Sequence, residues 1–555
     1  MARTLPTSES LTVEFKSDRA KLSDNDLAEA IVALANTDGG ELWLGVEDDG
    51  RPTGLHRDHL NLDGLAGLVA ARTSPSVRVG VSQIQANGVL VAQIIVPQMP
   101  GDVCTTSGKY LWRKLKSDGS PESAPMHPHD RASRSTSFGL TDLSAQPVTG
   151  ADLSDFDPLE RERLRQSIER YGGDSSLIDL NDEKLEGAMG LSTRLPDGRR
   201  VPTLAGLLLI GREESLRRLV PTHEIAFQVL SDESVRFNDF QHIPLLKALS
   251  WLESSFHPHN PDEDELQIDL FRVKVPRVDE RAFREAVANA LVHRDYMAIG
   301  AIHVRLEEHS LTISNPGGLV DGVTVASLLT TEPRPRNPRL ADIMKRIGIV
   351  ERAGRGVDAI YRGMLRFGRS VPDYGSTDRR SVVLRLSVGA ADRSFLRMIV
   401  EEESRLRRPL PLDSLLVLSV LKEAKRVATD ELARTLNRDV AQVKRTVEAL
   451  VETGIVEAHG GTPRTRSYTL SARIYRASGD HAAFTRQVGF GAIQNEQMIL
   501  NFVRQHGRIR RSDVTELCRL TAEQARSLLK KLTLEEKLIQ HGTRRGAYYS
   551  LGQAG

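Results

Sequence analysis

The chain has only two cysteines among its 555 residues, Cys104 and Cys518, and they lie far apart. A disulfide framework or a zinc site of clustered cysteines needs more cysteines at closer spacing, so the sequence favours neither. No apolar run approaches the roughly 18 residues of a membrane span. The opening residues, MARTLPTSESLTVEFK, have no apolar signal core. We therefore expect a cytoplasmic protein that makes no membrane contact.

The length of the chain exceeds what one hydrophobic core usually organises, so three to five domains are expected. Hydrophobic residues make up 39% and charged residues 27% of the chain, which is typical of globular proteins and not of disordered ones. Helical and strand-like segments alternate along the sequence. The expected fold class is an α+β multidomain protein.

Positive charge is concentrated at one end of the chain. The formal net charge is only +1, yet from Pro411 onward 23 Lys and Arg face 15 Asp and Glu. An excess of eight positive charges in this last segment favours contact with a polyanion. DNA is the expected partner, and RNA is the alternative.

Residues 1–130 read as an α+β domain. The segment LTVEFK is strand-like, and LSDNDLAEAIVALANTDGG places Leu27, Ile31 and Leu34 at helical spacing before a glycine pair. The segment ELWLGVEDDG then alternates apolar and polar residues and ends in a turn.

Acidic residues of this domain form one candidate site. Glu9, Glu14 and Lys16 belong to the opening strand, and Asp48 ends a later one. Carboxylates with a lysine can hold a divalent cation and stabilise a phosphodiester transition state. The alternative is that these groups are simply solvated at strand ends.

The elements ESLTVEFK and IVALANTDGGELWLGVEDDGRPTG resemble the AlbA-like domain shared with the Schlafen family. The resemblance covers about the first 130 residues and implies nucleic-acid binding. In Schlafen nucleases an acidic triad cleaves RNA, and the resemblance assigns it to Glu9, Glu14 and Asp48, with Lys16 as the accompanying lysine. Nuclease activity and DNA binding without cleavage both remain open.

Residues 131–157 are rich in Ser, Thr and Asp without a period, which predicts a linker or extended arm. Residues 158–278 mix helical segments with the apolar run TLAGLLLIG. We expect a connector domain there, and its sequence indicates no function.

A polar stripe marks the helix expected at RAFREAVANALVHRDY. One face is apolar, whereas Glu285, Asn289 and His293 recur at i, i+4 and i+8 on another. A carboxylate can polarise a water aimed at a γ-phosphate, and an Asn carbonyl can ligate Mg²⁺. Two strands and a glycine loop follow, and Gly354, Arg355 and Gly356 precede a further helix, whose free amides favour phosphate.

Four ordered motifs, EAVANALVHRDY, ISNPGGL, RNPRLADIM and ERAGRGVDAI, resemble the GHKL ATPases. They are most similar to the branch found in bacterial RecG-helicase-related proteins and transcriptional regulators. The resemblance implies a Bergerat-type α/β sandwich over residues 279–390, with Glu285 as the ATPase base and Asn289 as the Mg²⁺ ligand. ATP and Mg²⁺ are the expected cofactors, and the residues around adenine and phosphates are Asn289, His293, Asn315, Gly317, Gly318, Gly354, Arg355 and Gly356. GHKL proteins generally have Asp where this chain has Asn315.

Two segments, residues 409–478 and 492–552, each read as three helices followed by a basic hairpin, which predicts paired winged helices. They resemble bacterial winged-helix regulators. Third helices with outward basic side chains can enter the major groove, and basic wings can contact the flanking backbone. The expected DNA contacts are Arg438, Gln442, Lys444, Arg445, Arg464, Arg466, Arg526, Lys530, Lys531, Arg544 and Arg545. Alternatively, one of the two domains is purely architectural.

These features together indicate an ATP-responsive, DNA-binding regulator of transcription that forms a homo-oligomer. One alternative is a metal-dependent nuclease gated by ATP, in defence against foreign nucleic acid. Another is a nucleotide-sensing scaffold without catalysis. The sequence leaves open whether ATP is hydrolysed or only sensed.

Overall fold

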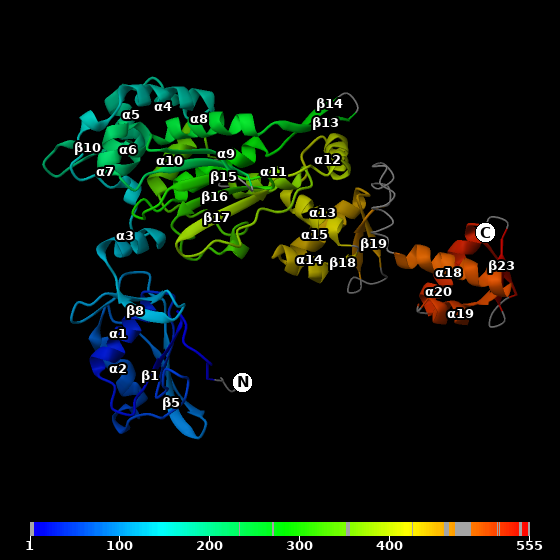
Figure 1. The fold of residues 1–555 in the computed structure, drawn as a ribbon, viewed down its shortest axis with the longest axis horizontal. Coiled ribbons are helices and arrows are strands. Elements are labelled where there is room, and N and C mark those ends of the chain that lie inside the picture. Colours follow the sequence, from blue (N-terminus) through cyan, green and yellow to red (C-terminus); the bar gives the residue numbers. More distant parts are fainter. Residues whose placement is uncertain are drawn as a thin grey trace. The chain divides into compact units, whose positions relative to one another are not determined.

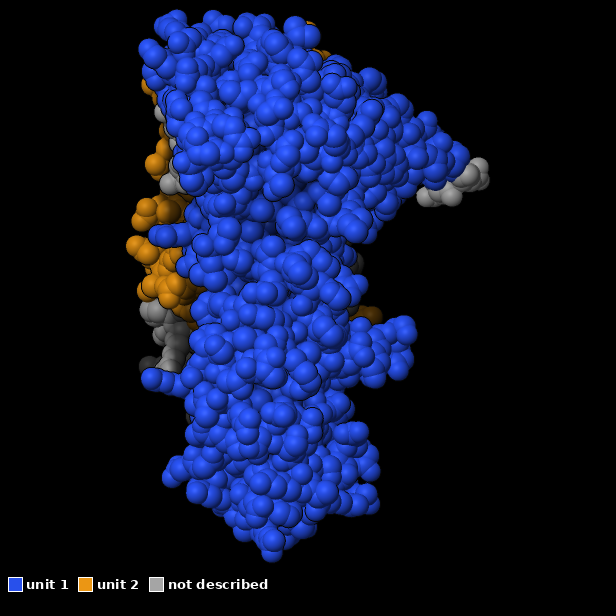
Figure 2. Space-filling view, turned by 90° about the vertical axis from the view of Figure 1, so that its left-hand side faces the viewer, with its two compact units in different colours: residues 1–259, 283–357, 373–386 blue, residues 260–282, 358–372, 387–555 orange. Residues whose placement is uncertain are grey.

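A computed structural model describes most of the chain: residues 5–231, 234–268, 271–350, 356–424, 426–459, 466–471, 490–518, 520, 522–542 and 547–552. Two compact units, distinguished by colour in Figure 2, are residues 1–259, 283–357 and 373–386, and residues 260–282, 358–372 and 387–555. Within the described residues, no helix combines the length and apolar character needed to cross a membrane.

The N-terminal part of the first unit is an α+β domain, as predicted. Its main sheet has the order β1-β2-β5-β4, in which β1 and β2 are parallel and the other pairs antiparallel. Leu27, Ile31 and Leu34 on its first helix are fully buried beneath this sheet's apolar side chains. The larger elements are β1 (Val13–Lys16), α1 (Asp24–Ala35), β2 (Gly40–Leu44), α2 (Leu62–Arg72), β4 (Gly80–Ala86) and β5 (Val89–Val96). Two short antiparallel pairs complete it, β3 (Thr73–Ser74) with β6 (Cys104–Thr105) and β7 (Leu111–Leu115) with β8 (Pro121–Pro125).

A glycine is required where α1 gives way to β2. Gly40 has φ +134°, and a Cβ there would lie 2.1 Å from the Thr12 carbonyl oxygen. No other residue fits this approach. The glycine pair therefore holds the opening strand β1 against β2.

The linker predicted over residues 131–157 is wrong. Residues 131–137 belong to helix α3 (Pro128–Ser137), which Figure 1 shows in cyan, and the 3-10 turns η2 (Leu143–Ala145) and η3 (Leu153–Asp155) follow. Pro128 occupies the first turn, and the Asp130 side chain bonds back to the N-cap backbone. Arg134 and Thr136 are buried although the segment has no apolar stripe. This helix is held by polar contacts, described below. It therefore lacks the periodic apolar residues by which a helix is recognised in a sequence.

Helices form most of the predicted connector. α4 packs against α6, α8 and the later helix α10 (Pro338–Ile347). All seven residues of α6 are buried, which explains the apolar run TLAGLLLIG. The elements are α4 (Pro158–Arg170), α5 (Asp182–Met189), β9 (Ser192–Arg194), β10 (Arg200–Pro202), α6 (Leu204–Ile210), α7 (Glu213–Leu219) and α8 (Leu245–Phe256).

One five-stranded sheet crosses the domain boundary predicted at residues 278/279, so that boundary is wrong. The order is β12-β11-β15-β16-β17, and β11 pairs in parallel with β15. Figure 1 shows α4, α8 and α9 (Glu280–His293) along one side of β15, β16 and β17. The strands are β11 (Ile225–Ser231), β12 (Ser234–Gln241), β15 (Ile302–Leu306), β16 (Ser310–Pro316) and β17 (Ser381–Ser387). The region around residues 225–241 thus belongs to the same layer as the predicted ATP site.

The second unit contains two small domains with the same element order. Each has a helix, a strand, two helices and two strands, and the sheet orders are β18-β20-β19 and β21-β23-β22. This agrees with the order predicted from the sequence. The first comprises α13 (Leu412–Glu423), β18 (Val427–Ala428), α14 (Thr429–Leu436), α15 (Val440–Glu452), β19 (Val456–His459) and β20 (Ser467–Leu470). The second comprises α18 (Phe490–His506), β21 (Ile509–Arg510), α19 (Arg511–Leu517), α20 (Ala522–Leu534), β22 (Leu538–His541) and β23 (Tyr548–Leu551).

Three further elements belong wholly to the second unit. They are the hairpin of β13 (Asp262–Ile268) and β14 (Phe271–Pro276), and helix α12 (Arg393–Leu406). Val275, Phe367, Leu396 and Val400 form a small apolar core there.

Candidate nucleotide site

Helix α9 (Glu280–His293) carries the polar stripe predicted from the sequence. Its apolar side is buried through Phe283, Val287 and Leu291, as expected. The Phe283 ring stacks on Phe256 of α8 with centroids 4.0 Å apart. The end of the helix is held by Asn337, whose side-chain amide donates to the carbonyls of Val292 and Arg294, each at 2.8 Å. These contacts fix the rotation of α9 and therefore the direction of its polar face.

The start of α11 (Gly356–Leu365) lies directly against this polar face. A Cβ added to Gly356 would lie 2.7 Å from Oε2 of Glu285 and 3.4 Å from both Nδ2 and Oδ1 of Asn289. Glu285 is 4% exposed and Gly356 is buried. The structure thus brings three of the predicted nucleotide-site residues together. Gly354 and Arg355 lie outside the described residues.

The glycine loop after β16 is braced by backbone contacts. The Gly317 amide donates to the Arg380 carbonyl at 2.7 Å, and the Gly318 amide donates to the Arg379 carbonyl at 3.2 Å. Asn315 is 4% exposed, and its side-chain amide donates to the Pro316 carbonyl at 3.3 Å. Both loop amides therefore already have partners, and the loop would shape a site by its close packing.

Gly317→Ala is expected to destabilise the first unit strongly. Gly317 has φ +92°, and an added Cβ would lie 2.6 Å from the Cβ of Asp295, so strain and overlap act together. We expect a loss of about 3 kcal/mol or more. Gly150→Ala is the matched control, because Gly150 has φ +80° and open space around it. The control should cost only about 1 kcal/mol. Calorimetric melting of both variants measures this, and equal melting temperatures would show that the contact with Asp295 is not tight.

His293 does not provide a positive charge. Burial, with a further contribution from the Arg336 guanidinium, lowers the pKa of His293 to about 4. The imidazole is therefore neutral at pH 7, so any contact that it makes with a nucleotide is that of a neutral group.

Asp295 and Arg336 are functional candidates that the sequence analysis missed. Asp295 is 2% exposed, and its amide donates to the Pro316 carbonyl at 2.8 Å. Arg336 is 3% exposed, lies 3.9 Å from the Asp295 carboxylate, and donates to the Gly318 carbonyl at 3.0 Å. The pair connects the end of α9 to the glycine loop. Asp295 lies in the motif EAVANALVHRDY and Arg336 in the motif RNPRLADIM, but the resemblance to the GHKL ATPases assigned neither residue a role.

The acidic residues of the N-terminal domain do not form a metal-ligand group. Glu14 is 5% exposed and forms ion pairs with Lys16, at 2.5 Å, and with Arg113. Glu9 accepts a 2.8 Å hydrogen bond from the Phe15 amide, and Asp48 is exposed. Within the described ranges, no three His, Cys, Asp or Glu side chains are grouped to hold a metal ion. Arg113, which the sequence analysis did not single out, neutralises Glu14 in this arrangement.

The predicted DNA contacts of the first C-terminal domain divide into two groups. Lys444 and Arg445 are exposed on α15. Arg438 and Gln442, predicted to face outward, instead bind Asp413 of α13 at 3.3 and 2.6 Å, and the Arg438 side chain is only 8% exposed. The outward placement of these two residues is therefore wrong.

In the second C-terminal domain, Arg526, Lys530 and Lys531 are exposed on α20 as predicted, and Lys531 lies 3.6 Å from Glu535. Of the wing arginines, Arg466 is partly buried. Arg464, Arg544 and Arg545 lie outside the described residues.

Comparison with protein families assigns two of these regions. Residues 9–120 match the Schlafen AlbA_2 family, and residues 300–386 match HATPase_c_4, described as "Putative ATP-dependent DNA helicase recG C-terminal". The chain is thus a multidomain protein with an ATPase-like domain. More particularly, it combines a Schlafen AlbA_2 domain with a RecG-related HATPase domain, which confirms both resemblances. These domains point to ATP binding and a nucleic-acid-related function. The second match begins after α9, so it does not reach Glu285 or Asn289.

Two further family matches carry no assigned activity. Residues 130–226 match a domain of unknown function, DUF8451, and residues 413–467 match HVO_A0114. No curated protein matches the chain.

Two solved structures are similar to this chain to different extents. The DIP2311 protein from Corynebacterium diphtheriae is 22% identical, with a TM-score of 0.51 over 98% of this chain and 95% of that one. The structure described as "N-terminal Domain of Putative ATP-dependent DNA Helicase RecG-related Protein from Nitrosomonas europaea" is 24% identical over 22% of this chain and 88% of that one, with a TM-score of 0.17. The first likeness shows a common fold.

Proposed function

We propose that the chain is a nucleotide-responsive, nucleic-acid-binding regulator that binds Mg-ATP between α9 and the start of α11. The observation that carries this proposal is the approach of the Gly356 backbone to Glu285 and Asn289. Any side chain at residue 356 would occupy the space beside the carboxylate and the amide. A helix start without a side chain also lets its backbone amides come close to bound phosphate oxygens.

The residues present fit a magnesium–nucleotide complex. Asn289 would hold the metal through its amide oxygen, and a bound Mg²⁺ would neutralise phosphate charge. Glu285 is suited to orient and polarise a water, because its 4% exposure limits competition from bulk solvent. The first turn of α11 offers amides for phosphate oxygens.

Calorimetric titration of the full chain with ATP, in Mg²⁺ and in EDTA, tests this proposal. We expect one site per chain and much weaker binding without the metal. Glu285→Gln should keep the affinity, because it retains the shape of the side chain, and should abolish any turnover. An absence of ATP binding by the wild-type chain in Mg²⁺ would refute the proposal.

Nucleic-acid binding is assigned to the AlbA_2 domain and to the two C-terminal domains acting as winged helices. The exposed cations Lys444, Arg445, Arg526 and Lys530 on α15 and α20 support this assignment. Such helices reach phosphates and base edges in the major groove. We further propose a homo-oligomer, which sedimentation analysis of the full chain tests directly.

A metal-dependent nuclease is the second candidate, supported by the match of residues 9–120, which include Glu9 and Glu14, to the Schlafen AlbA_2 family. If this cluster cleaves RNA or DNA, cleavage requires a divalent cation and is lost in Glu9→Ala and in Glu14→Ala, while binding largely survives. Asp63→Ala, a charge removal on α2, is the control. Gel assays with labelled RNA and DNA measure this. Cleavage that persists in both glutamate variants would exclude this cluster.

A further inference from the structure

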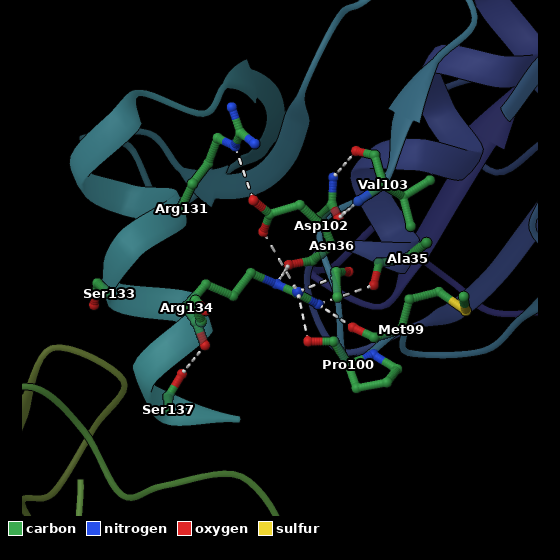
Figure 3. A network of polar contacts seen from close by, with 12 residues as sticks. Ala35, Asn36, Met99, Pro100, Asp102, Val103, Arg131, Ser133, Arg134 and Ser137 are labelled. Atoms are coloured by element: carbon green, nitrogen blue, oxygen red, sulfur yellow. Dashed lines mark hydrogen bonds and ion pairs between the residues drawn. The ribbon is translucent and has the colours of Figure 1, made fainter. Parts of the chain in front are cut away.

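Helix α3 is fastened to the AlbA_2 domain by one buried arginine. The Arg134 guanidinium, 7% exposed, donates to the carbonyls of Asn36 at 2.9 Å, Gly101 at 3.0 Å, Ala35 and Pro100, and also to that of Met99 (Figure 3). Asp102 balances its charge at 3.9 Å and also pairs with Arg131 at 2.8 Å. This single side chain thus holds the end of α1 and the segment after β5 together.

Another face of the same helix is fastened to the ATPase-like domain. The Ser133 hydroxyl donates to the Asp295 carboxylate, and Arg336 donates to the Ser133 carbonyl and the Thr136 hydroxyl, each at 3.4 Å. The Asp321 amide donates to the Ser137 carbonyl at 3.0 Å. Residues 133, 136 and 137 share one face of a helix, and residues 131 and 134 share another. The ten-residue helix is therefore a short rigid link with a partner on each side.

The acceptor of the Ser133 hydrogen bond, Asp295, is close in sequence and in space to the proposed nucleotide site. Asp295 is two residues beyond the end of α9, which carries Glu285 and Asn289. Its backbone also binds Pro316, and its Cβ would touch any side chain at Gly317. A change in α9 or in the glycine loop therefore moves the acceptor of the Ser133 hydroxyl. An ion pair between Asp38 and Arg379 joins the same two domains.

We propose that α3 couples nucleotide binding to the AlbA_2 domain, through the Ser133–Asp295 hydrogen bond on one face and Arg134 on the other. The inference rests on the proposed function. Nucleotide that repositions α9 shifts Asp295, α3 follows as a rigid body, and Arg134 carries the movement to residues 35–36 and 99–101. Allosteric coupling of this kind is reciprocal, so nucleic acid on the AlbA_2 domain also changes nucleotide affinity.

Hydrogen exchange of the full chain, with and without Mg-ATP, tests the coupling. The variant is Ser133→Ala, which removes the hydroxyl without disturbing the helix. Ser135→Ala is the matched control, because Ser135 lies on the same helix and its hydroxyl hydrogen-bonds to Thr141, beyond the end of that helix, at 2.8 Å. In the wild type and the control, Mg-ATP should change exchange by about fivefold or more in peptides covering residues 33–37 and 99–103.

Ser133→Ala should still bind Mg-ATP, as calorimetry measures, while the change in these peptides falls below about twofold. The proposal is overturned if Ser133→Ala shows the wild-type response, or if nucleotide-bound wild type shows no response in these peptides. Failure of the wild type to bind Mg-ATP overturns the proposed function itself, and calorimetry distinguishes that outcome from the other two.

Discussion

Asn289→Ala is expected to lower the affinity for Mg-ATP by about 100-fold or more, because the metal–phosphate complex loses its protein ligand. The side-chain amide of Asn289, on α9, lies beside the start of α11. It is 3.4 Å from the position that a Cβ on Gly356 would take. Glu285→Gln should bind Mg-ATP with the wild-type affinity. The two variants thus distinguish the residue that anchors the metal–nucleotide complex from the residue that orients the water. Calorimetry measures both affinities.

Asn501→Ala is the control for this variant, since it makes the same change on an exposed position of α18. It should bind Mg-ATP like the wild type. Equal affinities in Asn289→Ala and the wild type would remove Asn289 from the site.

Neutralising the exposed cations of α15 and α20 is expected to have the second large effect, on nucleic-acid affinity. Each phosphate contact contributes about −0.9 to the slope of log affinity against log salt, so four lost contacts flatten the slope by about 3.6. The variant in which we expect this change combines Lys444→Gln, Arg445→Gln, Arg526→Gln and Lys530→Gln. Salt titration of a labelled DNA duplex bound to the full chain measures the slope.

The control variant neutralises four exposed arginines that lie between residues 170 and 217, namely Arg170, Arg194, Arg199 and Arg217. It removes the same charge, so it reports the general effect of net charge. A slope that changes equally in both variants would show that α15 and α20 do not contact phosphates. Arg438→Gln should instead destabilise its domain, because it breaks the contact with Asp413.

The polar face of α9 was largely predictable from the sequence, because its residues repeat along one helix. The spacing of Glu285, Asn289 and His293 shows a polar face locally, and Gly356 at the start of α11 marks a close approach. The neutral state of His293 was not predictable, because it depends on burial and on Arg336, 43 residues further along the chain.

Features that depend on distant partners escaped prediction. Helix α3 has no apolar stripe, since Arg134 is stabilised by carbonyls 33 to 99 residues away. The sheet boundary was misplaced because β11 pairs with β15, with the whole of α8 and α9 between them. Arg438, just before α15, and Gln442, in its first turn, have the pattern of outward residues. Their contacts with Asp413, 25 and 29 residues earlier, turn them inward.

If nucleotide state controls nucleic-acid binding, Mg-ATP must change the affinity of the full chain for DNA or RNA. Labelled duplex DNA and single-stranded RNA are titrated with the full chain, with and without saturating Mg-ATP, at one fixed salt concentration. We predict that Mg-ATP changes at least one of these affinities by about fivefold or more, the lower range of allosteric coupling. Binding of both ligands with unchanged affinities would contradict the account.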